Sequence, residues 1–356
     1  MSTATRPCRV SIVIKALNEE RNVGAAIESC LAALRNIDGE VVLADSHSTD
    51  GTVREASRYP VRVVRLADPA QRSCGAGPQL GYQHAVGEYV YILDGDMKLV
   101  PGFLEQALSF LAQHPEIAGV GGRVVELNQE SLEYRERGER SLKLEAHRLP
   151  GQVDRLDGGG LYRRRAIEEA GWLSDRNLHS YEEFDLATRL RARGWKLWRL
   201  PFDAVTHYGH DAPPYQLLMR RWRSRYACGP GELVRASLGQ PHFRLVVRGL
   251  RELRLYVAVV GWWLALLSAP LWPLPLAARA ACLAVLAAAP LAIMAWRKRS
   301  WTRALYAVAS WNVNSAGLVR GLLAPRIAPS ERIASEVLHE PLEANEVDRK
   351  ERNTAQ

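Results

Sequence analysis

The stretch that most constrains this chain runs from Val86 to Pro101 and reads Tyr-Val-Tyr-Ile-Leu before Asp-Gly-Asp. Its β-branched and aromatic residues lack the spacing of an amphipathic helix, which is typical of a strand buried on both faces. Asp94 and Asp96 follow this strand, and Gly95 allows a sharp turn that lets both carboxylates converge. Hard oxygen ligands suit Mg²⁺ or Mn²⁺ together with substrate phosphates. Taken alone, the same sequence also describes a surface turn, so its weight depends on the rest of the chain.

Strand-like and helix-like segments alternate through the first hundred residues. Apolar strands are expected at residues 10–14, 40–44 and 61–66, with helices between them. This order predicts an α/β fold with a largely parallel sheet, helices on both faces, and ligands at the carboxyl ends of the strands. Four polar groups follow such ends: Asn18 with Glu19, Asp45, a Gly-rich loop beginning at Arg72, and Asp94 with Asp96.

Charge and cysteine usage narrow the class of protein. The five cysteines contain no Cys-x-x-Cys pair, which argues against a zinc site or a disulfide framework and fits a reducing compartment. The net charge of +8 is concentrated between Arg220 and Arg254, where nine arginines accompany two glutamates. Residues 226–254 are therefore expected to be a basic juxtamembrane segment. Nucleic-acid binding is disfavoured because aromatic stacking motifs are missing. The N-terminus lacks the apolar region of a signal peptide.

Residues 255–296 are apolar apart from Arg279 and are interrupted by prolines. Each half is about the minimum length of a bilayer span, for which roughly 17–25 residues are needed. Positive charge stands before the first half and again at residues 297–299. This pattern predicts a transmembrane helical hairpin with both ends in the cytoplasm and Arg279 near its turn. A buried helical pair in a soluble domain is the alternative.

Two further segments follow the hairpin. Residues 297–323 contain Asn312 and Asn314 and are expected to form an interfacial helix rather than a third span. Residues 324–356 are expected to be a charged, disordered tail.

A series of short motifs stands in the order and spacing of one enzyme family. The series comprises Ser-Ile-Val-Ile at 11–14, Asn18-Glu19, Asp-Ser-His-Ser-Thr-Asp-Gly-Thr at 45–52, Asp94-Gly95-Asp96, Gly-Gly-Gly-Leu-Tyr-Arg-Arg at 158–164 and Glu-Glu-Phe-Asp-Leu at 182–186. As a set it resembles the family 2 glycosyltransferases of the GT-A fold over roughly residues 8–225. The resemblance implies a Rossmann-like GT-A domain, mostly parallel in its sheet, in residues 1–225.

The chain departs from the family pattern at four places, one of which is Glu183, where many members have aspartate. Lys15 stands where proline is usual, and Ser46-His47 replace the Asp-Gly of the common Asp-Asp-Gly-Ser turn. The Gln-x-x-Arg-Trp motif of processive synthases is only approximated, because Gln216 lies too far before Arg221-Trp222. This last departure argues against processive polymerisation.

The resemblance implies a donor site for a nucleoside diphosphate sugar. Asp45 would bind the base edge, and Asn18 with Glu19 the ribose or base region, while Arg72 and the N–H groups that follow it approach the diphosphate. Asp96 would bind Mg²⁺ or Mn²⁺ directly, with Asp94 on the metal or the ribose. His207 would be a third metal ligand, with His210 as its rival.

The resemblance also implies an acceptor side. Glu182, Glu183 and Asp185 crowd the start of a helix, where the helix dipole favours carboxylates whatever their role. Crowding of like charges raises one pKa towards a value useful for a general base. By its match to the family motif Glu183 is the predicted base, and Glu182 is the alternative. The predicted acceptor-binding residues are Gly159, Gly160, Arg163 and Asp185.

The function predicted from these motifs is inverting, metal-dependent sugar transfer to a hydroxyl of a lipid-linked saccharide, at the cytoplasmic face of the plasma membrane. Such transfer belongs to surface or exported polysaccharide synthesis. The partners would be a nucleoside diphosphate sugar, the lipid-linked acceptor and membrane lipids. One alternative is a polyprenyl-phosphate glycosyl synthase, whose phosphate acceptor is already ionised and needs no base. Another is an inactive membrane scaffold of a polysaccharide-export complex.

Overall fold

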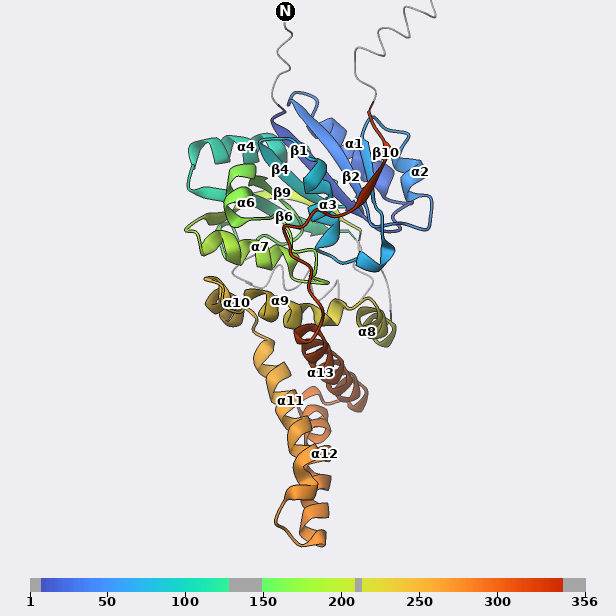
Figure 1. Cartoon of the computed structure of the whole chain (residues 1–356), viewed down its shortest axis with the longest axis vertical. Coiled ribbons are helices and arrows are strands. Elements are labelled where there is room, and N and C mark those ends of the chain that lie inside the picture. The colour runs from blue at the N-terminus through green and yellow to red at the C-terminus, as the bar shows by residue number, and fades with distance from the viewer. Residues whose placement is uncertain (1–7, 128–148, 209–212, 342–356) are drawn as a thin grey trace, which may run out of the picture. The chain divides into compact units, whose positions relative to one another are not determined.

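The computed structural model describes residues 8–127, 149–208 and 213–341 (Figure 1). These residues form two compact units. The sheet unit contains the residues up to Asn177, the stretch from Glu182 to Tyr208 and the segment from Ile327 on. The helical unit contains residues 178–181 and the stretch from Pro213 to Arg326. The expected domain boundary at residue 225 therefore falls inside the helical unit, and the chain returns to the sheet unit after it.

The described strands of the sheet unit form one mixed sheet. Its order is β10-β3-β2-β1-β4-β8-β6-β9-β5, with β7 beside β9. The strands are β1 (Val10–Ala16), β2 (Gly39–Asp45), β3 (Arg62–Leu66), β4 (Tyr89–Asp94), β5 (Met97–Leu99), β6 (Ile117–Glu126), β7 (Gly151–Val153), β8 (Gly160–Arg163), β9 (Lys196–His207) and β10 (Ser335–His339).

The first four strands pair in parallel, as the sequence predicts. Every residue of β1 except Lys15 is buried, which explains why the strand reads as a continuous apolar run. The pairing sets Ala16 opposite Asp45 and Lys15 opposite Asp94. The carboxyl ends of β1, β2 and β4 therefore lie side by side at one edge of the sheet.

The other half of the sheet is mixed rather than parallel. Strand β8 pairs antiparallel with both β4 and β6, while β6 and β9 are parallel. Strand β5 begins directly after Asp96 and pairs antiparallel with β9, so that Met97 faces His207. This pairing brings the end of β9 next to the Asp-Gly-Asp turn, although the two segments are far apart in sequence.

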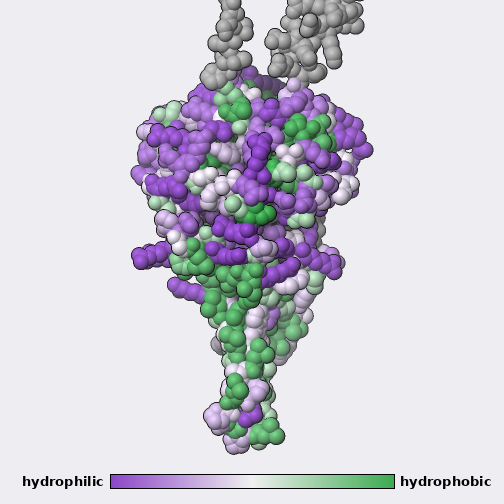
Figure 2. Space-filling view, in the orientation of Figure 1, coloured by the Kyte–Doolittle hydropathy of each residue, from purple (hydrophilic) through white to green (hydrophobic). Residues whose placement is uncertain are grey.

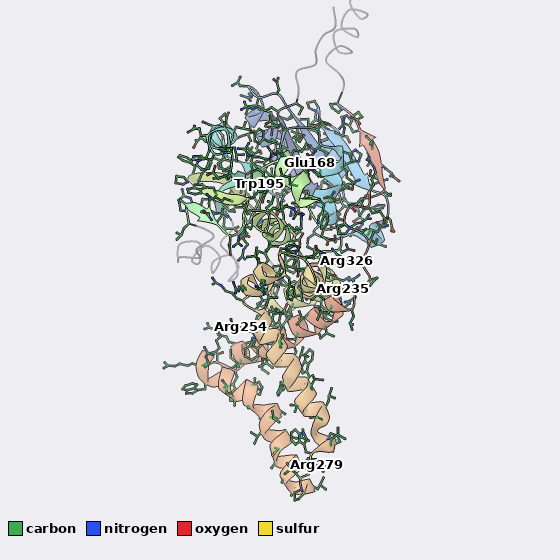
Figure 3. The ribbon with its side chains drawn as sticks, turned by 60° about the vertical axis from the view of Figure 1, so that its left-hand side comes forward. Glu168, Trp195, Arg235, Arg254, Arg279 and Arg326 are labelled. Carbon is green, nitrogen blue, oxygen red and sulfur yellow. The ribbon has the colours of Figure 1, made fainter. Side chains whose placement is uncertain are left out.

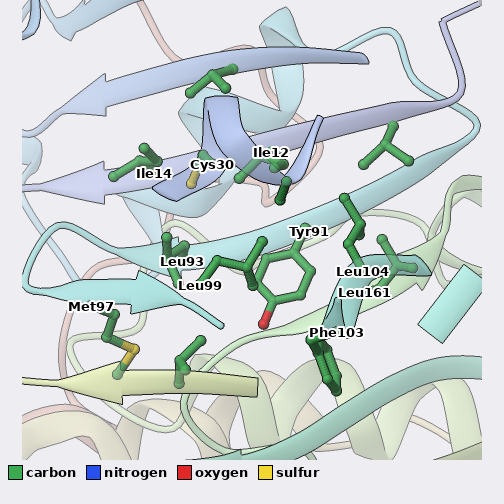
Figure 4. Packing of buried hydrophobic residues seen from close by; sticks show 14 of the residues in the cluster. Ile12, Ile14, Cys30, Tyr91, Leu93, Met97, Leu99, Phe103, Leu104 and Leu161 are labelled. Carbon is green, nitrogen blue, oxygen red and sulfur yellow. The ribbon is translucent and has the colours of Figure 1, made fainter. Parts of the chain in front are cut away.

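Helices cover both faces of the sheet. Alternate residues of β1 point to opposite faces: Ile12 and Ile14 pack with α1 and α4, whereas Val13 packs in the cluster that contains α6 and α7. Figure 4 shows the first cluster, in which the Tyr91 ring meets Phe103 edge-on with 6.3 Å between ring centroids. The helices of this unit are α1 (Val23–Ala33), α2 (Thr52–Ala56), η1 (Pro69–Gln71), α3 (Ala76–His84), α4 (Phe103–Gln113), α6 (Arg164–Ala170) and α7 (Glu182–Arg191).

The tail does not follow the expectation of disorder throughout residues 324–356. Strand β10 pairs antiparallel with β3 at the edge of the sheet. Ion pairs support this pairing: Arg65 contacts Glu336 of β10 at 2.6 Å, and Arg62 contacts Glu340, which directly follows β10, at 2.9 Å. The expectation is wrong for this segment, since a charged strand can be stabilised by a partner that only the fold supplies.

The helical unit contains the predicted apolar hairpin. Helices α11 and α12 are joined by a proline-rich turn, and the indole N–H of Trp262 in α11 donates to the Leu286 carbonyl in α12 at 2.9 Å. The described elements of this unit are α8 (Pro214–Arg223), η3 (Tyr226–Cys228), α9 (Gly229–Ser237), α10 (Phe243–Gly249), α11 (Leu253–Ser268), η4 (Ala269–Leu271), α12 (Leu276–Lys298) and α13 (Trp301–Leu322).

Among the described helices, two segments are long and apolar enough to cross a membrane. Leu253–Leu271 has 19 residues and Leu276–Lys298 has 23, with mean hydropathies of 1.5 and 2.0 in their most apolar windows. Only 11% and 0% of those windows are buried, and the surface of this hairpin is largely hydrophobic (Figure 2). Arg254 and Arg279 lie at its two ends (Figure 3). At the turn, the Arg279 guanidinium donates to the carbonyls of Trp272 and Leu274.

The predicted interfacial helix corresponds to α13, which packs closely on α9 and η3. A Cβ added at Gly317 would lie 2.2 Å from the Ala227 carbonyl oxygen, and one at Gly321 would lie 2.2 Å from that of Cys228. The Gly-x-x-x-Gly spacing in α13 therefore allows backbone-to-backbone contact.

Candidate active site

The predicted nucleotide-binding residues gather around the turn that follows β2. Asp45 is fully buried at the strand end, and its Oδ2 accepts a hydrogen bond from the Ser48 N–H at 2.9 Å. Its Oδ1 is buried without a hydrogen-bond partner. A buried acceptor of this kind is costly unless a donor reaches it, so it is a candidate to receive an N–H group of a ligand.

Two of the predicted donor-site residues hold this turn in place. Asn18 has φ of 59°, and its Oδ1 accepts from the Thr49 N–H at 2.8 Å. Arg72 donates to the backbone carbonyls of Ser46, at 2.8 Å, and His47. The guanidinium of Arg72 is therefore engaged by the protein's own backbone rather than directed at open solvent.

Glu19 stands beside the same turn. Its backbone N–H donates to the Thr52 hydroxyl at 2.8 Å, and its carboxylate accepts from the Asn22 side chain at 3.0 Å. The structure thus brings Asn18, Glu19, Asp45 and Arg72 together. It adds Thr52, which in the sequence stands out only as the last residue of the motif at 45–52.

Lys15 connects this region to the acidic helix. Its ammonium lies 3.0 Å from Asp94 Oδ1 and 3.0 Å from Glu182 Oε1. Burial alone would lower the pKa of Lys15, but the two carboxylates hold it well above its ordinary value. Burial also raises the pKa of Asp94, although Lys15 opposes that change. The departure from the family's usual proline therefore places the Lys15 ammonium between Asp94 and Glu182.

Two of the predicted metal residues, Asp96 and His207, meet in a short chain of hydrogen bonds. His207 Nε2 lies 3.2 Å from Asp96 Oδ2, and its Nδ1 lies 2.6 Å from Glu126 Oε2. Burial alone would lower the pKa of His207, but hydrogen bonds to Asp96 and Glu126 raise it to about 10. A carboxylate on one ring nitrogen commonly orients a histidine whose other nitrogen binds a metal. Glu126 is thus a candidate supporting residue, and the sequence pattern did not indicate it.

The donor set fits a hard divalent cation that also binds substrate phosphates. Within the described residues, no three His, Cys, Asp or Glu side chains form a ready-made metal cage. Mg²⁺ usually takes only one or two carboxylates and completes its coordination with water and phosphate oxygens. Asp96, Asp94 and His207 are compatible with that pattern. His210, the rival ligand, lies outside the described residues.

Glu183 is held by a glycine loop. Its two carboxylate oxygens accept from the backbone N–H of Gly159 at 3.0 Å and of Gly158 at 3.3 Å. Gly159 has φ of +90°, and a Cβ there would lie 2.3 Å from the Ile92 carbonyl oxygen, so the loop requires glycine. Burial and the charge of Glu182 raise the pKa of Glu183 to about 8, although Lys15 opposes the rise.

A small pocket lies beside these carboxylates. Its volume is about 20 Å³, which suits a water molecule rather than a sugar. It is lined by Lys15, Pro78, Ile92, Tyr162, Leu173, Ser174, Glu182, Glu183 and Leu186.

Two predicted acceptor residues do not lie in this site. Asp185 and Arg189 form a buried ion pair of 2.8 Å on α7, each side chain only 2% exposed. Arg163 pairs with Tyr89 at the opposite end of β4 from Asp94, and its guanidinium donates to the Ile117 carbonyl. The assignment of Asp185 and Arg163 to acceptor binding is therefore corrected, because both side chains make internal contacts that stabilise the fold. Gly159 and Gly160 stay near the site, where Gly159 binds Glu183 and Gly160 pairs with Ile92.

Comparison with known proteins relates part of the chain to one family. Residues 11–171 match the model of glycosyl transferase family 2. Within these residues, the chain carries a family 2 glycosyltransferase domain. The matched region includes the predicted donor-site residues at the strand ends, whereas Glu182, Glu183 and His207 lie beyond it.

Several relatives share this glycosyltransferase domain. The chain is 32% identical over 159 residues to glucomannan 4-beta-mannosyltransferase 2 of Arabidopsis thaliana, which covers 42% of this chain and 28% of that protein. It is 29% identical over 150 residues to the undecaprenyl-phosphate 4-deoxy-4-formamido-L-arabinose transferase of Pectobacterium carotovorum, covering 40% and 44%. The chain thus spans about a quarter to about half of the length of the curated relatives it matches.

A solved structure shares the fold of the glycosyltransferase domain. It is a mannosyltransferase from Pyrobaculum calidifontis, in complex with GDP-Man and Mn²⁺. The TM-score is 0.55 at 20% identity, and the match covers 90% of this chain and 88% of the other. This likeness and the observed mixed sheet establish a GT-A-like fold.

Proposed function

We propose that this protein transfers a sugar from a nucleoside diphosphate sugar to a hydroxyl of a lipid-linked saccharide, with inversion and with a divalent metal. The reaction would serve surface or exported polysaccharide synthesis at the cytoplasmic face of the plasma membrane. The observation that carries this proposal is the chain of contacts from Asp94 through Lys15 to Glu182, with Glu183 next to it. It links the donor-side carboxylates to the acidic start of α7.

The donor would bind along the carboxyl ends of β1, β2 and β4. The unpartnered Oδ1 of Asp45 would accept an N–H of the base, and the loop of Asn18 and Glu19 would border the ribose. Asp96 and His207, with Asp94, would hold Mg²⁺ or Mn²⁺. When bound, the metal offsets the negative charge of the departing diphosphate. The archaeal mannosyltransferase with GDP-Man and Mn²⁺ provides a precedent for such a donor on this fold.

Glu183 would act as the general base. The acceptor oxygen forms a bond to the anomeric carbon, the bond from that carbon to the diphosphate breaks, and the acceptor proton passes to Glu183. A single displacement of this kind inverts the anomeric configuration. The raised pKa of Glu183 keeps its basicity close to neutral pH, where a positioned base is most effective. The Gly158 and Gly159 N–H groups orient its carboxylate.

The lipid-linked acceptor is proposed from the helical unit. Its two exposed apolar helices are suited to a bilayer, and the basic residues at their ends favour the cytoplasmic side of both ends. An acceptor carried on a lipid would explain why a glycosyltransferase domain is joined to such a hairpin.

A polyprenyl-phosphate glycosyl synthase is the second candidate. It is favoured by the similarity to the undecaprenyl-phosphate transferase of Pectobacterium carotovorum. Its acceptor would be an ionised phosphate, which needs no base. The buried, oriented Glu183 favours the hydroxyl acceptor instead.

The proposal is tested with purified full-length protein and a panel of nucleotide sugars. Metal-dependent hydrolysis of one donor, lost on chelation and restored by Mn²⁺ or Mg²⁺, is expected. Absence of hydrolysis and of binding across the whole panel would contradict the proposal and favour the scaffold alternative.

A further inference from the structure

A second pocket lies in the helical unit, between α12 and α13. Its volume is about 400 Å³, within the range of roughly 300–1,000 Å³ that small-molecule sites occupy. It is lined by Met294, Arg297, Lys298, Ala307 and Trp311. Two cations and an indole thus face one concave space in a region where helices otherwise expose apolar side chains.

The pocket lies at the end of α12 that is remote from the hairpin turn. Arg279, in the first turn of α12, binds carbonyls of the hairpin loop, and Arg297 follows eighteen residues later. At 1.5 Å per residue this separation is about 27 Å, close to the roughly 30 Å of a hydrocarbon core. If α12 crosses a bilayer, the pocket therefore lies at the level of the lipid headgroups.

Within the described helical unit, no carboxylate is left to pair with the positive charge of the pocket. The sequence contains no aspartate or glutamate between Glu252 and Glu331. The carboxylates of the described helical unit are Glu232 and Glu252, and they are engaged by His179 at 2.8 Å and by the Tyr181 hydroxyl. Arg297 and Lys298 are exposed and thus available for an anion from outside the protein.

The remaining walls suit a molecule that is polar at one end and apolar at the other. Met294 is buried, and Ala307 and Trp311 are half-buried. Trp296 and Trp301 are exposed nearby in sequence, as expected for indoles at a membrane interface. Guanidinium groups bind phosphate oxygens in pairs, and an ammonium adds a compact charge.

We propose that this pocket binds the phosphate headgroup of an anionic membrane lipid, whose chain continues along α12 and α13. Arg297 and Lys298 bind the phosphate oxygens, and Trp311 covers the first apolar atoms of the lipid. The inference rests on the membrane attachment in the proposed function but not on the chemistry of sugar transfer.

The test uses the full-length protein in a neutral detergent and counts bound lipids by native mass spectrometry. Phosphatidylglycerol, phosphatidylcholine and inorganic phosphate are the probes. Arg297→Gln with Lys298→Gln removes the charge, and Ala307→Phe fills the pocket without changing charge. Arg299→Gln with Arg303→Gln is the matched control, because it removes the same charge outside the pocket. Donor hydrolysis is measured on every variant.

Wild type should retain one phosphatidylglycerol at least about tenfold more tightly than either pocket variant, as expected for charge-assisted phosphate contacts. The control pair should resemble wild type. Equal losses in the pocket and control pairs would show diffuse electrostatic attraction and overturn the site, as would equal retention of phosphatidylcholine. Displacement by inorganic phosphate at similar concentration would assign the pocket to the free ion and overturn the lipid proposal. Failure of donor hydrolysis in wild type would contradict the proposed function while leaving the lipid result intact.

Discussion

Asp96 and His207 illustrate how single side chains define the proposed donor site. They meet at 3.2 Å although 111 positions separate them, because β5 pairs with β9 directly after the Asp-Gly-Asp turn. Glu126 fixes the second ring nitrogen of His207. Asp94 and Asp96 were predictable from sequence, since carboxylates after a buried strand lie at a sheet edge. The role of Glu126 was not predictable, because it depends on contact with His207 in another strand.

Replacement of Asp96 by Asn should abolish metal-dependent activity while preserving the fold. The change keeps side-chain size and removes the charged ligand, so turnover should fall by at least two orders of magnitude. The stabilisation of the protein by Mn²⁺ with a nucleoside diphosphate should also disappear from thermal melts. Near-normal turnover in the variant, or activity of wild type that EDTA does not change, would contradict the proposed metal site.

Lys15 and Glu183 together predict the pH dependence. A general base must be unprotonated before it can accept a proton, and the pKa of Glu183 is raised to about 8. The kcat/KM for the free enzyme should therefore rise with pH and level off above about 8. The Lys15 cation holds the pKa of Glu183 down. Lys15→Met removes that cation, so the pH at which kcat/KM levels off should move higher. A profile that is flat from pH 5 to 9 in wild type would contradict the assignment.

At the scale of elements, the start of helix α7 carries the proposed reacting carboxylates, whereas its middle carries an ion pair that stabilises the fold. Glu182 and Glu183 stand at its start, while Asp185 forms a buried ion pair with Arg189, whose guanidinium also donates to the Trp172 carbonyl at 2.6 Å. The sequence could predict the acidic helix start but not this division of roles. The roles differ because Asp185 and Arg189 are buried against neighbouring segments, and the spacing of charges in the sequence does not reveal burial.

Breaking this pair should destabilise the protein rather than its chemistry. Asp185→Ala leaves the buried Arg189 uncompensated, at a cost of about 3–5 kcal/mol. The melting temperature should fall by on the order of 10 °C. The double variant Asp185→Leu with Arg189→Met should recover much of the loss, because both charges are then absent. An unchanged melting temperature in Asp185→Ala would restore Asp185 as a candidate acceptor residue.

At the scale of the whole molecule, the chain combines a GT-A-like sheet unit with a helical unit. The alternating order of strands and helices was readable from sequence, as was the hairpin, because both depend on local periodicity. The pairing of β10 with β3 was not, since it joins segments more than 250 residues apart. The close packing at Gly317 and Gly321 was likewise hidden in a weakly apolar helix.

The hairpin predicts how the whole chain partitions. Two exposed apolar helices should keep the full-length protein in the membrane fraction through high salt and alkaline carbonate, and detergent should be needed to release it. The full-length double variant Leu264→Glu with Val285→Glu places a charge in each helix and should be released from the membrane fraction by alkaline carbonate. Release of the unmodified chain by salt alone would mean that it is attached by basic residues only.

The central claim is sugar transfer to a hydroxyl with Glu183 as the base, and single-turnover transfer tests it most directly. Glu183→Gln keeps the shape and removes the proton acceptor, with Glu182→Gln as the matched neighbour. We expect a loss of roughly 10²–10⁴-fold in transfer for Glu183→Gln, with nucleotide affinity nearly unchanged, and a smaller loss for Glu182→Gln. A large loss at Glu182 alone would move the base by one residue. Normal transfer in both variants would contradict the hydroxyl-acceptor mechanism and favour the polyprenyl-phosphate synthase.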